Sequence, residues 1–415
     1  MIMPHALRGN AAIFPYSLFD FANSSFVLII HTYLFPLYFK NVLMGGSPNA
    51  DAIWGTIFAC SALIAAAIAP FVGALADGRN RYKVFFAIAL LSFVSAVILG
   101  LSIGSTVVVI SIVFIVANVC FYLASNMYDS LLTIVAAPNQ RALFSGFSWG
   151  FGYTGGVVCF LIVYAFQSRF GVGSRLPYVI TGLFYLVFGC IAVVLLRRHV
   201  TGSIRTRQLT FREILSKLDR PRALLLLGYA LISDCVSAVT LFAAIYGSTE
   251  LHLSDKVIGA WLLGIQLLAF PLTYLVSKLT VPWGIFKTLA LCIGIWVIII
   301  GVLVFSTSFI LFMVVAALTA AVIGTTQSLT RAQYSLYIEP FRTSEIFGWY
   351  AIATKSAAIA APLVFGFVSA WSGSQRLAMS LMVVPLIAGL LFVKKGYNLF
   401  ARVYGESADS AVRSV

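Results

Sequence analysis

Residues 73–83 read "GALADGRNRYK" and lie between two apolar runs, each of more than 20 residues. A helix needs about 20 apolar residues to cross a bilayer, so the string is a short turn between two membrane spans. The carboxylate of Asp77 can accept hydrogen bonds from turn amides, and Arg79 and Arg81 hold such a turn at the membrane surface. These eleven residues therefore indicate two adjacent membrane helices.

The rest of the chain is also predominantly apolar. Of its 415 residues 61% are hydrophobic and 10% are charged, against roughly 25% charged in a soluble domain. Short strands of alternating polarity, as in a membrane barrel, are absent from the sequence, and no small-residue cleavage site follows the first apolar run. We predict an all-α membrane protein with twelve spans, at about 14–39, 50–76, 82–103, 106–132, 141–167, 177–197, 222–247, 256–279, 283–306, 308–333, 343–371 and 376–394.

The formal net charge of +14 reflects topology. With both termini in the cytoplasm, 21 of the 27 basic residues fall on inside segments and five on outside segments, which is the positive-inside pattern. We therefore expect a multi-pass protein of a bacterial inner membrane, with the lipid bilayer and not nucleic acid as its surroundings.

Motifs for catalysis and metal binding are missing. The six cysteines all lie in apolar runs without CxxC spacing, and neither GxxxxGK[ST] nor HExxH occurs. We therefore expect no metal, no cofactor, no ATPase-driven pump and no enzymatic activity.

The longest connection divides the chain in two. We predict an N-terminal six-helix bundle at 1–197, a cytoplasmic linker at 198–221 and a C-terminal six-helix bundle with a cytoplasmic tail at 222–415. Within the linker, 210–218 is either a surface amphipathic helix or solvated basic chain. Two six-helix halves around a midplane cavity are the architecture of the major facilitator superfamily.

Several strings carry a family resemblance. The turn at 73–83 resembles the signature GxLaDxxGxRK of that superfamily, with Asn80 in place of a glycine. "YSLFDFANSSF", "GFSWGFGYTGG", "SDCVSAVT" and the block 324–366 resemble the corresponding helices of the Atg22-like vacuole effluxer family. Asp129 stands where the family has Asn, and the second-half counterpart of the turn lacks its Asp. The resemblance implies export of small solutes, with amino acids as a precedent, along a pathway lined by the first, fourth, seventh and tenth helices.

Polar residues in those spans recur at helical spacing. The spacing places each set on one face of its helix. The faces comprise Tyr16, Asp20, Asn23, Ser24 and His31 in the first span, Asn118, Tyr122, Ser125 and Asp129 in the fourth, and Gln327, Arg331 and Tyr334 in the tenth. Such residues either line a pathway or hold helices together, and for His31 an ordinary hydrogen-bonded role is favoured over metal binding.

We assign candidate roles on this basis. The predicted substrate or ion pathway comprises Asp20, Asn23, His31, Asn118, Tyr122, Asp234, Gln327 and Lys355, and the predicted gating residues are Asp77, Arg79, Arg81, Asp129 and Arg331. Asp234 and Lys355 lie at equal depth in their spans, which predicts an ion pair. A carboxyl group removed from water favours its protonated form, so Asp20 is the predicted proton site.

These inferences predict a monomeric secondary transporter that works by alternating access. Its expected partners are a small polar or zwitterionic solute, such as an amino acid, and protons or another coupling ion. Transport of an organic anion or a siderophore-like chelate remains open, as does a receptor or scaffold on the same fold.

Overall fold

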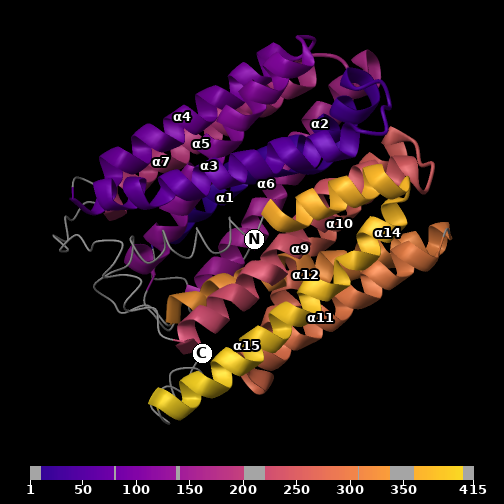
Figure 1. Cartoon of the computed structure of the whole chain (residues 1–415). Coiled ribbons are helices and arrows are strands. Elements are labelled where there is room, and N and C mark those ends of the chain that lie inside the picture. The colour runs from indigo at the N-terminus through magenta and orange to yellow at the C-terminus, as the bar shows by residue number, and fades with distance from the viewer. Residues whose placement is uncertain are drawn as a thin grey trace.

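The computed structural model describes residues 11–78, 81–136, 141–200, 220–306, 308–336 and 359–404, and within these ranges every regular element is a helix. Eleven helices are long and apolar enough to cross a membrane, and a shorter apolar helix, Ile359–Ser372, falls in the predicted eleventh span. The helices run side by side along one common direction (Figure 1). The prediction of a helical multi-span membrane protein is confirmed.

The first span combines several elements, and single long helices form most of the others. We call residues 11–200 the first half; it contains α1 (Ile13–Phe26), η2 (Val27–Tyr33), α2 (Leu34–Leu37), η3 (Tyr38–Leu43), α3 (Ala50–Gly78), α4 (Arg81–Ser102), α5 (Val107–Val135), α6 (Arg141–Phe170) and α7 (Leu176–Val200). We call residues 220–404 the second half; it contains α9 (Arg220–Thr249), α10 (Asp255–Lys278), α11 (Thr280–Phe305), α12 (Phe309–Leu336), the helix Ile359–Ser372, α14 (Gln375–Leu381) and α15 (Val383–Tyr404).

The helix boundaries follow hydropathy and local capping. The predicted first span, 14–39, corresponds to the apolar segment Ile13–Leu43, and the predicted span at 177–197 corresponds to α7. At the start of α5 the Thr106 hydroxyl accepts a hydrogen bond from the backbone N–H of Val109, which satisfies one of the free amides of a helix N-terminus. The predicted linker helix at 210–218 lies outside the described residues.

The described connections divide between the two ends of the bundle. The turns 44–49, 102–106, 171–175, 250–254 and 373–374 lie together at the upper right of Figure 1. We call this the first-turn end, because it holds the first turn of the chain. Gly45 and Gly46 adopt φ of 57° and 74° there, a conformation that glycine allows without a steric penalty.

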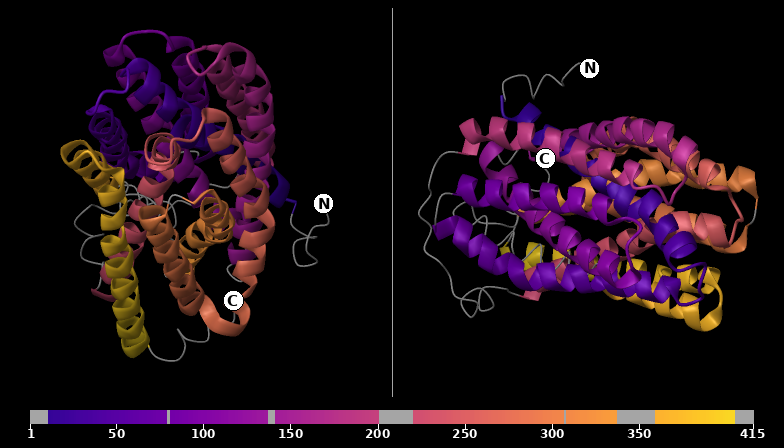
Figure 2. Two further views of the ribbon diagram at one scale, coloured as in Figure 1. Left: turned by 90° about the vertical axis from the view of Figure 1, so that its right-hand side faces the viewer. Right: turned by 90° about the horizontal axis from the view of Figure 1, so that it is seen from above.

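The two halves face each other across the middle of the molecule. Within the first half α4 packs on α5 and α7, and within the second half α9 packs on α15 and α10 on α12. Between the halves, α6 packs on α10 and α12, and η2 packs on α9. The left view in Figure 2 shows the indigo-to-magenta first half mostly above the second half, which ends in yellow. The two halves therefore meet through η2 and α6 on one side and α9, α10 and α12 on the other.

Candidate functional site

A cavity of about 270 Å³ lies at the centre of the interface between the halves. Its walls come mainly from α1, η2, α5 and α6 of the first half and from α9, α10, α11 and α12 of the second, with one residue each from α3 and α14. Aromatic rings cover much of the wall, and hydroxyl, amide and carboxylate groups interrupt them. Such an enclosed apolar space with a few polar groups is typical of a small-molecule site.

Asp20 is held in the cavity wall by a compact hydrogen-bond network. Its Oδ2 accepts hydrogen bonds from the Tyr128 hydroxyl at 2.8 Å and from the Ser148 hydroxyl at 2.7 Å. Tyr128 and Ser148 lie 2.9 Å apart, and Tyr128 also stacks on the rings of Tyr16 and Phe19. The network joins α1, α5 and α6, so the predicted site residue on the first span is fixed by side chains from two other spans.

The glycines of α6 permit this close approach. A β-carbon at Gly155 would overlap the carbonyl of Phe21, and one at Gly152 would lie 3.2 Å from Cβ of Asp20. Gly156 lies one helical turn beyond Gly152 against the same helix, α1. Gly152, Gly155 and Gly156 of the glycine-rich string are therefore a packing surface for the helix that carries Asp20.

His31 lies in a π-helical segment, η2, in an aromatic environment. The π-helix is rare and often occurs at functional sites. The His31 ring is 6% exposed and lies 5.1–5.3 Å, centroid to centroid, from the rings of Phe26, Phe58 and Phe121. Within the described residues no three His, Cys, Asp or Glu side chains gather as a metal site would require.

The structure brings six of the predicted residues to the cavity. They are Asp20, Asn23, His31, Tyr122, Asp129 and Gln327. Asn23 is further positioned by the Tyr185 hydroxyl, which donates to its Oδ1 at 3.2 Å. The predicted pathway residues on the first, fourth and tenth spans therefore face a common space.

Asn118 and Asp234 do not line this cavity, in contrast to the expectation. Asn118 points from α5 to α3, where its Nδ2 donates to the Ser61 hydroxyl at 2.6 Å. Asp234 points from α9 to the helix Ile359–Ser372, where its Oδ2 accepts the backbone N–H of Ala361 at 2.8 Å. Both side chains are buried and connect neighbouring helices in these positions.

The structure does not describe the side chains of four predicted residues. Lys355 and Arg79 are outside the described residues, and the side chains of Asp77 and Arg331 are not described. Arg81 begins α4, with its side chain half-buried at the end opposite the first-turn end. The pairs Asp129–Arg331 and Asp234–Lys355 therefore stay predictions.

The cavity also contains residues that the sequence did not single out. They come mainly from helices that were not expected to line a pathway, and include Trp149 and Tyr153 of α6, Trp261 and Gln266 of α10, and Trp296 of α11. They are aromatic or amide side chains on otherwise apolar helices, and they do not form a row of polar residues that the sequence would reveal. On α6 the string "GFSWGFGYTGG" is a sequence signal, but its glycines stand out from it and Trp149 and Tyr153 do not.

The halves are joined at the first-turn end by a buried carboxylate. Asp51 of α3 is 3% exposed; its Oδ1 pairs with Lys40 Nζ at 2.9 Å. Its Oδ2 accepts hydrogen bonds from two side chains of the second half, the Ser369 hydroxyl at 2.8 Å and Gln375 Nε2 at 2.6 Å. The backbones of the two halves touch beside it, since a β-carbon at Gly55 would lie 2.5 Å from the carbonyl oxygen of Pro362.

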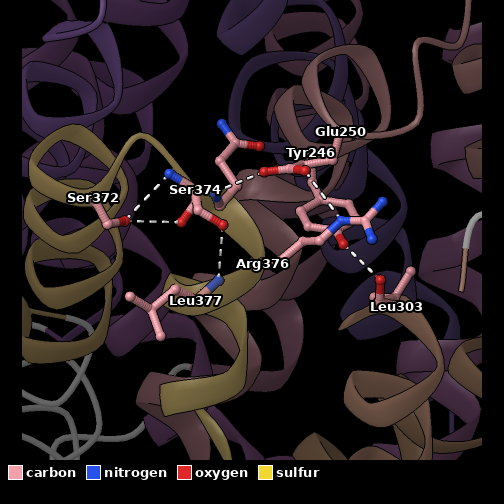
Figure 3. A network of polar contacts seen from close by, with 8 residues as sticks. Tyr246, Glu250, Leu303, Ser372, Ser374, Arg376 and Leu377 are labelled. Atoms are coloured by element: carbon pink, nitrogen blue, oxygen red, sulfur yellow. Dashed lines mark hydrogen bonds and ion pairs between the residues drawn. The ribbon is translucent and has the colours of Figure 1, made fainter. Parts of the chain in front are cut away.

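A second network adjoins the first. Glu250 at the end of α9 accepts the backbone N–H of Gln375 at 2.8 Å and pairs with Arg376 Nε at 3.1 Å (Figure 3). Tyr246, one turn earlier on α9, donates its hydroxyl to the carbonyl of Leu303 at 2.6 Å. Tyr246 and Leu303 line the cavity, so these contacts form its wall toward the first-turn end.

Comparison with known proteins agrees with this architecture. The model of the family described as "Vacuole effluxer Atg22 like" matches residues 136–395. The chain belongs to the Atg22-like vacuole effluxer family. A curated relative, described as an uncharacterized MFS-type transporter, YxiO, of Bacillus subtilis (strain 168), is 24% identical over 396 residues, which cover 91% of this chain and 92% of the relative.

Solved structures of the same fold cover nearly the whole of this Atg22-like chain. A bacterial homologue of the iron transporter ferroportin, in an outward-facing state, superposes with a TM-score of 0.67 at 17% identity over 93% of this chain and 98% of its own. The human organic anion transporter MFSD10 superposes with a TM-score of 0.70 at 15% identity over 94% and 100%. At these identities the likeness concerns the fold. The protein is thus a multi-pass membrane transporter of the major facilitator type.

Proposed function

We propose that this Atg22-like protein is a secondary active transporter that moves a small polar or zwitterionic solute, such as an amino acid, out of the cell. The cavity between the halves is the observation that carries the proposal, because a transporter of this fold binds its substrate at the interface of its two repeats. The bundles at 1–197 and 222–415 would rock about this site, and the linker at 198–221 would connect them.

The contacts at the first-turn end support alternating access. Asp51, Ser369 and Gln375 join the halves at that end. Basic side chains concentrate at the opposite end, at Arg197 and Arg198 of α7 and at Lys394 and Lys395 of α15. By the positive-inside rule the opposite end is cytoplasmic, in a bacterial inner membrane, so this conformation is closed toward the outside.

Proton coupling is proposed at Asp20. This carboxylate lines the cavity and is bonded to two neutral hydroxyls, of Tyr128 and Ser148. A carboxylate that is exposed to the substrate space in one conformation can load a proton on one side of the membrane and release it on the other. Ionisable residues at such depth are expensive to insert and commonly belong to proton relays or substrate sites.

The test is flux into vesicles that contain the purified protein, with a panel of labelled amino acids and small amines. We expect accumulation of at least one solute when a pH gradient is imposed. Asp20→Asn should abolish this accumulation and leave some solute exchange at equal pH when the solute concentration is high enough to fill a weaker site. Accumulation that responds to a sodium gradient at constant pH would contradict proton coupling, and absence of any flux would favour a receptor or scaffold.

A further inference from the structure

The charge of the cavity wall narrows the class of ligand. Two carboxylates, Asp20 and Asp129, belong to the wall, and no Lys or Arg whose side chain the structure describes does. This contrasts with the chain as a whole, which has 27 basic and 13 acidic residues. The described part of the wall therefore favours a cation and disfavours an anion.

The aromatic residues of the cavity wall also favour a positively charged ligand. The faces of Trp and Tyr rings carry negative potential and attract ammonium groups, most strongly where water is excluded. Seven such side chains line the cavity: Tyr122, Tyr128, Trp149, Tyr153, Tyr246, Trp261 and Trp296. They come from both halves, so a ligand among them would contact both.

Buried acceptors near Asp20 have no hydrogen-bond partner. Gln266 Oε1 of α10 and the Tyr153 hydroxyl of α6 are both buried and unbonded, and Tyr153 is 6% exposed. Both residues belong to the cavity wall. An unpaired buried acceptor costs free energy, and a ligand that donates hydrogen bonds would remove that cost.

The glycines of α6 show where Gln266 lies relative to Asp20. A β-carbon at Gly152 would lie 3.2 Å from Cβ of Asp20, and one at Gly156 would lie 3.7 Å from Gln266 Oε1. These two glycines are four residues apart, about 6 Å along the helix. The Asp20 carboxylate accepts a hydrogen bond from Ser148, one turn before Gly152, so Asp20 and Gln266 present acceptors at different levels of the same wall.

We propose that the cavity binds the ammonium group of an organic amine at Asp20, with the unpaired acceptors of Gln266 and Tyr153 and the aromatic rings in the surrounding wall. This inference rests on the proposed function and makes it more specific: the required feature of the substrate is its positive charge. A carboxylate on the same substrate is not needed for binding. The organic-anion alternative is disfavoured by the same wall.

The experiment measures equilibrium binding to the purified full-length protein in lipid nanodiscs, with radiolabelled phenethylamine as the probe. Unlabelled 2-phenylethanol and 3-phenylpropionate are the competitors, because they keep the ring and replace the ammonium by a hydroxyl or a carboxylate. We expect phenethylamine to bind at least tenfold more tightly than either. Equal binding of the three, stronger binding of the acid, or no binding of the amine would overturn the proposal.

Variants locate the site. Asp20→Asn and Gln266→Leu should each weaken phenethylamine binding at least tenfold and leave binding of 2-phenylethanol within twofold. Asp255→Asn is the control, because that half-buried carboxylate begins α10 and does not line the cavity; this variant should bind the amine as the wild type does. An unchanged affinity in both Asp20→Asn and Gln266→Leu would exclude this site. Amine binding without vesicle flux would instead remove the transport proposal and retain the site.

Discussion

Gln375 donates a 2.6 Å hydrogen bond to Asp51, a residue 324 positions earlier in the chain. Asp51 lies at the start of α3 and Gln375 at the start of α14, so this bond joins the two halves at the first-turn end. The acceptor is a buried carboxylate, and a hydrogen bond to a charged group contributes about 1.5–3 kcal/mol. The contact is therefore a substantial part of what holds this end closed.

Gln375→Glu should open the first-turn end. The substitution replaces the donor with a second carboxylate beside Asp51, and two like charges at this distance repel each other. Spin labels at exposed positions Asn49 and Ser372 report the separation of the halves. We expect a longer-distance population to dominate in Gln375→Glu and to rise about tenfold or more in Gln375→Met. A distance distribution identical to wild type in both variants would contradict the assignment.

The Lys40–Asp51 ion pair should behave as a unit. Removal of one partner of a buried pair leaves a lone charge, at a cost of about 3–5 kcal/mol, whereas removal of both costs less. We therefore expect Lys40→Met and Asp51→Asn each to lower the melting temperature of the purified protein, and the double variant to recover part of the loss. Strictly additive losses would mean that the two side chains stabilise the fold independently.

The glycine packing on α6 has a control within the same helix. Gly155→Ala would push a methyl group into the backbone of Phe21, and such overpacking costs about 1–3 kcal/mol. At Gly146 nothing lies within 4 Å of an added β-carbon, and Ala is the better helix former by about 0.5–1 kcal/mol. Thermal unfolding should show Gly155→Ala less stable than wild type and Gly146→Ala equal or more stable.

Asp129 and Arg331 are predicted to approach each other when the cytoplasmic side closes. Asp129 lines the cavity and Arg331 lies in the last turns of α12. Asp129→Arg and Arg331→Asp should each reduce flux, and the two together should restore part of it, because the swap recreates the attraction. If the swapped protein is no more active than the worse single variant, the two charges act separately.

Asp234 and Lys355 are predicted to form an ion pair at mid-membrane depth. Asp234 already accepts the backbone N–H of Ala361, so its carboxylate faces the helix that follows Lys355 in the chain. Asp234→Asn should reduce expression or activity, and the addition of Lys355→Met should restore expression. A double variant that expresses no better than the worse single one would assign each charge to the substrate or the coupling ion.

Hydropathy was enough to predict the fold. Each apolar run within the described residues corresponds to a helix because a membrane span must satisfy all of its backbone hydrogen bonds internally. The position of Asp20 in the cavity wall was also predictable, since a carboxylate at that depth needs polar surroundings. The termini of the first span and of α7 differ from prediction by four residues at most.

The sequence predicted less well which neighbour each polar side chain contacts. Helical spacing placed Asn118 on one face of its helix with Tyr122 and Asp129. Asn118 nevertheless contacts Ser61 of α3 and not the cavity. A helix face about 60° wide can contact two different neighbours. Asp234 illustrates the same limit, since its partner is a backbone amide that no sequence pattern reveals. The contact of Gln375 with Asp51 needed the tertiary structure, because both residues lie near turns and neither belongs to a stripe.

Each of the two ion pairs described at the first-turn end joins two residues of the same half. Lys40 and Asp51 belong to the first half, and Glu250 and Arg376 belong to the second. When the halves separate, each ion therefore keeps its counter-ion, and the contacts that break with Asp51 are those of the neutral donors Ser369 and Gln375, which water can replace. Separation of a buried ion pair would cost several kcal/mol per ion, and every 1.4 kcal/mol slows a step about tenfold. Under the proposed alternating access, this placement of the charges lowers the barrier for the closed end to reopen in each turnover.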